Sequence, residues 1–141
     1  MPHAYEWAVL RLVPRVERCE SVNVGVVVYC RALDFLAASV SDDLSRALAL
    51  DPDLDVAAVR MGLESVLAVC AGSPEAGENG RRSPGERFRW LVAPRSTVVQ
   101  PSPVHTGLTD DPAAELADLA ARMVAWPPAR SGRPVPEERE S

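Results

Sequence analysis

The sequence predicts an α+β domain, in which an antiparallel sheet of about four to five strands carries two to three helices packed on one face. Three observations lead to this prediction. Segments rich in β-branched residues fill the region of residues 5–41, Asp-Pro pairs mark helix starts further along, and no internal repeat is present. With 141 residues, the chain has the size of one domain with a single core.

Three strands are expected in the N-terminal part of the chain. Residues 5–13 alternate between two sets of side chains, as a strand with one buried face does, and Pro14 ends them. Residues 20–30, ESVNVGVVVYC, form the second strand because β-branched residues dominate them. Residues 33–41 form a third, shorter strand.

Capping residues and apolar spacing predict three helices. A short helix over residues 42–50 begins at a Ser-Asp cap. Asp51–Pro52 provides an N-cap and a first helical residue for a second helix, which Gly72 ends. Asp111–Pro112 repeats this start for the last helix.

The remaining segments complete the expected domain, which covers residues 1–126. Residues 72–86 are rich in Gly, Pro, Ser and charge, a composition typical of a mobile loop. Two strands, or one strand broken near Pro94, are expected between residues 87 and 100, followed by an extended connection. Residues 127–141 contain almost nothing to bury and are predicted to be a disordered tail.

Composition narrows the function classes. The net charge of -5 and the pI near 5.0 argue against nucleic acid and against an anionic membrane surface as partners. All 15 basic residues are arginine, which removes lysine chemistry. The three cysteines lack the spacing of a zinc site or a disulfide framework. We expect a cytoplasmic protein with no membrane span, no metal and no cofactor.

The strand over residues 20–30 raises the question of a binding face. Simple alternation places an apolar stripe on one face: Val22, Val24, Val26, Val28 and Cys30. The other face would hold Ser21, Asn23, Gly25, Val27 and Tyr29 and, from the first strand, Tyr5, Trp7 and Arg11. Aromatic and polar groups together suit binding. The alternative is structural: Gly25 marks a β-bulge or a close contact, and Asn23 satisfies a backbone group.

Other polar residues are weaker candidates. His105 lies near Ser102, Thr106 and Asp110, but a catalytic histidine needs a partner that spacing alone does not show. Arginines between residues 81 and 95 interleave with Phe88 and Trp90, which resembles a small phosphate or RNA contact patch. A solvated loop and the outward face of a strand explain the same pattern and are favoured at this pI.

Two blocks of sequence carry a family resemblance. The segments YEWAVLRLVPRVERCESVNVGVVVYC and FRWLVAPRSTVVQPSPVHTGLTDDPAAELADLAARMV resemble the bacterial domain-of-unknown-function 3037 family over about residues 4–126. The resemblance implies no established activity, cofactor or catalytic residue. It implies a HipA-like kinase as a protein partner, because similar members are often encoded beside such a gene. Its motif positions in this chain would be Arg11, Asn23, Gly25, Arg89, Ser96, Gln100, His105 and Asp110.

Two further function classes stay open beside the favoured one. The favoured interpretation is a small non-catalytic binding or accessory protein. The first alternative is a small enzyme or nucleotide-handling domain with a site near Arg11, Asn23, Arg89 and His105. The second is weak nucleic-acid binding through the arginines of residues 81–95. The candidate binding residues are Arg11, Asn23, Gly25, Tyr29, Arg89, Gln100, His105 and Asp110.

Overall fold

The computed structural model describes residues 1–95 and 97–125, and its architecture confirms the predicted α+β class. A 5-stranded antiparallel sheet has the strand order β3-β2-β1-β4, and β5 also pairs with β1. The strands are β1 (His3–Leu12), β2 (Val22–Cys30), β3 (Phe35–Val40), β4 (Val99–Pro101) and β5 (His105–Thr109). The predicted tail, residues 127–141, lies outside the described residues.

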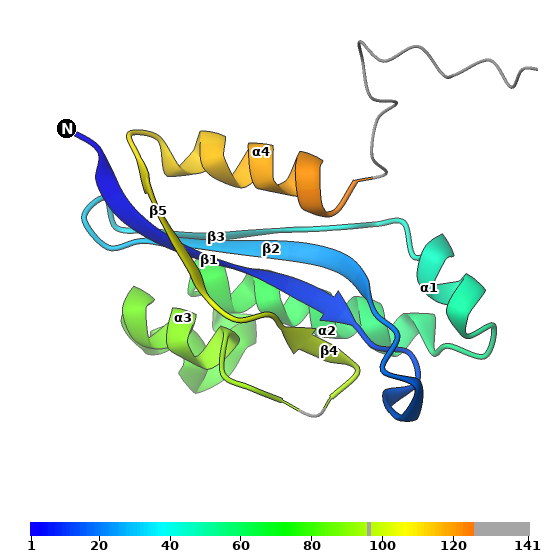
Figure 1. Ribbon diagram of the computed structural model, residues 1–141. Coiled ribbons are helices and arrows are strands. Elements are labelled where there is room, and N and C mark those ends of the chain that lie inside the picture. The colour runs from blue at the N-terminus through cyan, green and yellow to red at the C-terminus, as the bar shows by residue number, and fades with distance from the viewer. Residues whose placement is uncertain (96, 126–141) are drawn as a thin grey trace, which may run out of the picture.

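Helices cover both faces of the sheet. They are α1 (Ser45–Leu50), α2 (Val56–Ala71), α3 (Pro84–Leu91) and α4 (Pro112–Met123), with the short 3-10 segments η1 (Val16–Arg18) and η2 (Pro74–Arg81). Helix α2 packs on one face together with α3, which was expected to be a strand, whereas the predicted last helix, α4, lies across the opposite face and not beside α2 (Figure 1). The sheet therefore separates two apolar cores.

Each core uses one set of β1 side chains. Ala8, Leu10 and Leu12 point toward α2 and α3, where they pack with Phe88. The intervening residues point toward α4, and Tyr5 packs there with α4. The Tyr5 hydroxyl donates a hydrogen bond to Glu115 Oε2 on α4 at 3.4 Å. Burial, and after it the nearby Glu115 charge, raises the pKa of Tyr5.

A β-bulge in β2 overturns the simple alternation expected for residues 20–30. Leu10 pairs with Gly25 while Arg11 pairs with Asn23, so Val24 is an extra residue in β2. Val24 and Gly25 therefore both face α2, and Asn23 shares the α4 face with Val26. The predicted aromatic and polar face does not exist as one surface, because the bulge moves its members to opposite faces.

The segment after α2 is helical where a loop and a strand were expected. Pro74–Arg81 forms η2, and residues 84–91 form α3 rather than a strand. Ser83 caps α3 by accepting a hydrogen bond from the Glu86 amide at 3.3 Å, and Pro84 occupies its first turn. A Ser cap, a following proline and a Glu three residues on constitute a helix-start signal that the alternation of arginine and aromatic residues obscured.

Two other boundaries differ from the expectations. Asp51 ends α1, because its amide donates to the Ala47 carbonyl, and α2 begins after the N-cap Asp55. The stretch expected to be an extended connection contains β5. The start of α4 at Asp111 and the end of α2 at Gly72, with φ 65°, agree with the predictions. Among the described residues, no single helix is long and apolar enough to cross a bilayer. Helices α2 and η2 reach the required length and composition only when they are taken together, and they are bent by 52° relative to each other.

Candidate functional site

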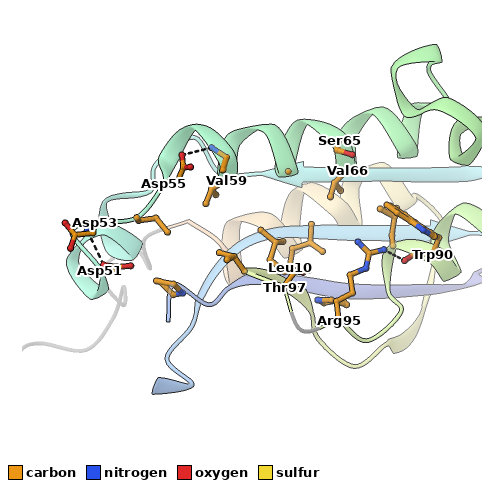
Figure 2. Close-up of a pocket in the computed structure, with 18 residues that line it drawn as sticks. Leu10, Asp51, Asp53, Asp55, Val59, Ser65, Val66, Trp90, Arg95 and Thr97 are labelled. Carbon is orange, nitrogen blue, oxygen red and sulfur yellow. Dashed lines mark hydrogen bonds between the residues drawn. The ribbon is translucent and has the colours of Figure 1, made fainter. Parts of the chain in front are cut away.

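A pocket of about 410 Å³ opens between α2 and the β4 edge of the sheet (Figure 2). Its floor comes from β1 through Leu10, and one side comes from residues 97–99 and Pro101. The opposite side is one face of α2, and Trp90 and Leu91 of α3 close the far end. The volume lies within the range of about 300–1,000 Å³ that is usual for ligand pockets.

Small side chains on α2 create this space. The pocket-facing residues recur at spacings of three and four and are Asp55, Ala58, Val59, Gly62, Ser65 and Val66. Three of them are Ala, Gly or Ser. A Cβ atom added to Gly62 would meet no atom within 4 Å, so the wall is open at the middle of the helix.

The two ends of the pocket differ in charge, as Figure 2 shows. Asp51, Asp53 and Asp55 lie together at one end. Asp51 accepts a hydrogen bond from Arg15 at 3.3 Å, and Asp55 caps α2. Asp53 forms no ion pair with any described residue. This end therefore keeps an excess of negative charge.

Trp90 and Arg95 form the opposite end. The Arg95 guanidinium lies over the Trp90 ring at 4.1 Å from its centroid and donates to the Trp90 carbonyl. Burial lowers the pKa of Arg95 from its ordinary value. Because its guanidinium is stacked and hydrogen-bonded, this arginine serves as a wall of the pocket.

The pocket suits an apolar group that is attached to a cation. Leu10, Leu54, Val66 and Val99 supply contact area without polar groups that need partners. The carboxylates at one end would attract the cation and orient the ligand.

The structure brings together three of the sequence-predicted site residues. Arg11 pairs with Asn23 on β2 and with Gln100 on β4, so the three side chains form a row across one face of the sheet. Asn23 Nδ2 donates to the Met123 carbonyl at 2.9 Å, near the end of α4. This bond supports the structural interpretation of Asn23, and a role in binding remains a prediction.

Gly25 has a packing role that sequence reasoning had considered. A Cβ atom there would lie 3.0 Å from the Ser39 carbonyl oxygen and 3.1 Å from Leu10 Cδ1. A larger residue at this position, where β1, β2 and β3 meet beside the bulge, would have to push these neighbours away. The bulge and the close contact expected for Gly25 are thus both present.

Of the other predicted site residues, Tyr29 and Arg89 line one broad pocket on the α3 side of the sheet, whereas His105 and Asp110 lie away from it. Arg89 donates twice to the Glu6 carboxylate at 2.9 Å on the α3 side, close to Tyr29. His105 stacks on Trp7, with 4.5 Å between the ring centroids, on the face of the sheet opposite to Arg89. Asp110 is exposed beside the start of α4, and Ser96 lies outside the described residues. The sheet itself therefore separates Arg89 from His105.

Three arginines between residues 81 and 95 have structural partners. Arg87 Nη1 donates to the carbonyls of Val69 and Cys70 at the end of α2, at 2.8 and 2.7 Å. Arg89 binds Glu6, and Arg95 stacks on Trp90. These guanidinium groups point to different places in the fold and do not form one patch.

The pocket residues were missed by sequence reasoning. The signal was present in α2, where Ala58, Gly62 and Ser65 interrupt the apolar face at helical spacing. The missing information was the position of β4, which lies opposite this face only in the folded sheet.

One comparison with known proteins finds a family. Residues 7–124 match the family described as "Protein of unknown function (DUF3037)", which covers most of the chain and all strands except the start of β1. The chain belongs to the DUF3037 family. No curated protein and no solved structure matches this DUF3037 chain. The match contains both the α2 pocket and the Arg11 row, so both lie within the family's domain.

Proposed function

We propose that this DUF3037 protein is a non-catalytic binding protein that accepts an apolar side chain of a partner protein between α2 and β4. A single observation carries the proposal: the pocket of about 410 Å³ is largely apolar and has three carboxylates at one end. An apolar side chain fills the space, and an adjacent basic residue of the partner meets Asp53.

The chemistry of this pocket favours binding over a reaction. Asp51 is held by Arg15, and Asp55 is held by the amide of Ala58. Arg95 is stacked on Trp90. These groups are already committed to structural contacts, whereas the apolar surface between them is open.

The partner that we propose is a HipA-like kinase, as the family resemblance implies. The net charge of -5 and the acidic end of the pocket favour a basic, apolar surface on that kinase. Co-expression with a HipA-like kinase should give a shared peak in size-exclusion chromatography. Separate peaks together with unchanged kinase activity would reject this partner.

The pocket chemistry can be tested without the partner. We expect phenethylamine to shift the amide signals of α2 and β4 in a saturable NMR titration, and to bind more tightly than neutral phenylethanol. Anionic phenylacetate should bind least, because the carboxylates repel it. An equal response to all three compounds would contradict the role of the acidic end.

Gly62→Leu provides the matched variant. The leucine side chain would enter the open wall and block the pocket, and glycine replacement also favours the helix by about 1 kcal/mol. We expect the affinity for phenethylamine to fall at least tenfold, while the thermal stability of the variant stays the same or rises. Met61→Leu, at a 70% exposed position of the same helix that does not line the pocket, should retain binding.

A further inference from the structure

A smaller hollow lies beside the other face of β4. It has a volume of about 210 Å³ and lies among the end of β1, the connection through η1 and strand β4. Its lining consists of Arg11, Val13, Val16, Cys19, Ser21 and Gln100. Because neighbouring residues of a strand point to opposite faces, Leu10 lines the α2 pocket while Arg11 lines this hollow.

Strand pairing places two donor groups next to each other. Arg11 and Gln100 are direct partners in the β1–β4 ladder, so their side chains leave the sheet on the same face. The chain between β1 and β2 closes the other side of the hollow, and Cys19 turns it there with φ 57°. The sheet, and not a loop, therefore fixes the points from which the Arg11 and Gln100 side chains enter the hollow.

The charge of this hollow is not balanced by the protein. Within residues 1–95 and 97–125, the Arg11 guanidinium forms no ion pair and no hydrogen bond, although it is half-buried. Arg15, Arg89 and Arg122, in contrast, each contact a carboxylate. No acidic residue lines the hollow, and Gln100 and Ser21 add further donors.

We propose that this hollow binds the carboxylate group of a small organic acid. A planar guanidinium offers two parallel donors to a carboxylate, and the neighbouring amide can donate a third hydrogen bond. One positive charge balances one negative charge, whereas a phosphate dianion would leave a charge without compensation in a half-buried site. Val13 and Val16 provide apolar contact for a short aliphatic tail.

An NMR titration with sodium butyrate tests the site at constant ionic strength, with sodium chloride as the reference. We expect saturable shifts in the amides of residues 16–21 and of β4. Butyramide, which has the same shape without the charge, should give none. Inorganic phosphate should bind at least tenfold more weakly than butyrate. Equal shifts with butyramide, or equal binding of phosphate, would overturn the proposal.

Arg11→Gln should weaken butyrate binding about tenfold or more, because the variant loses the charge-assisted hydrogen bonds of the guanidinium. Arg18→Gln is the matched control, because Arg18 lies in η1, pairs with Glu20 and does not line the hollow. If Arg11→Gln unfolds, Gln100→Leu replaces it, and unchanged butyrate affinity in the folded variant rejects the site. Gly62→Leu should leave butyrate binding intact, which separates this site from the α2 pocket.

Discussion

At the residue scale, Asn23 connects the sheet with the last helix. Its side-chain amide donates to the carbonyl of Met123, which is 100 positions away in the sequence. This carbonyl belongs to the last turn of α4, where backbone acceptors have no partner within the helix. An amide near the start of a valine-rich strand is thus explained by a helix end that needs a donor.

Asn23→Ala should lower the free energy of unfolding by about 1–3 kcal/mol, because the Met123 carbonyl loses its side-chain donor in a partly buried position. Urea unfolding monitored by circular dichroism measures this change. Asn79→Ala is the matched control, since the Asn79 side chain forms no hydrogen bond with a described residue, and it should change the stability little. Equal effects of the two substitutions would show that the contact with α4 contributes nothing.

At the element scale, capping contacts determine where α2 begins and ends. Asp55 accepts a hydrogen bond from Ala58 at the N-terminus, and Gly72 adopts a left-handed conformation at the C-terminus. Arg87 of α3 then reaches back to the last carbonyls of α2. A cation at a helix C-terminus also interacts favourably with the helix dipole. Arg87 therefore holds α3 against α2, beside the end of the pocket that Trp90 closes.

Arg87→Met should destabilise the protein by about 2 kcal/mol, because carbonyls of Val69 and Cys70 lose charged donors. The methionine keeps the apolar part of the side chain, so the loss reports the hydrogen bonds. Thermal denaturation provides the measurement. Arg81→Met, at an exposed arginine of η2, should leave the melting temperature almost unchanged. A similar decrease in both variants would argue against the cap.

At the scale of the whole molecule, the sheet carries a core on each face. Phe88 and Leu91 of α3 are fully or almost fully buried on one side, and Leu119 of α4 is buried on the other. Cys70 belongs to the larger core, and burial raises the pKa of its thiol to about 12. Cys19 is the exposed cysteine.

The raised pKa of Cys70 predicts a loss of stability in alkaline solution. Below pH 9.0, the ordinary pKa, the thiol is protonated in both the folded and the unfolded chain. Above it the unfolded chain loses a proton that the folded chain keeps, so the free energy of unfolding falls as the pH rises toward 12. Between pH 8 and 10 we expect Cys70 to account for a decrease of about 1 kcal/mol.

Urea unfolding at the two pH values, compared between the wild type and Cys70→Ala, isolates this contribution. The variant should lose about 1 kcal/mol less over the interval than the wild type. An identical pH dependence in the wild type and Cys70→Ala would contradict a buried, protonated thiol.

The sequence by itself determined the features that depend on neighbours along the chain. The β-branched run of β2, the Asp-Pro start of α4 and the glycine that ends α2 follow from local backbone preferences, and each was predicted. The family was also recognisable from two local blocks. The Ser83–Pro84 cap of α3 belonged to the same kind of signal, although the alternation of arginine and aromatic residues indicated a strand instead.

Only the tertiary structure decided which side chains share a surface. One extra residue in β2 reverses the alternation of its side chains. Local preferences do not reveal this bulge, because it exists only relative to the pairing with β1. The same is true of the two binding candidates, because β4 faces α2 and pairs with Arg11 although about 90 residues separate Arg11 from Gln100 in the sequence. Local chemistry therefore specified the elements, whereas long-range pairing assembled the pocket and the Arg11 row.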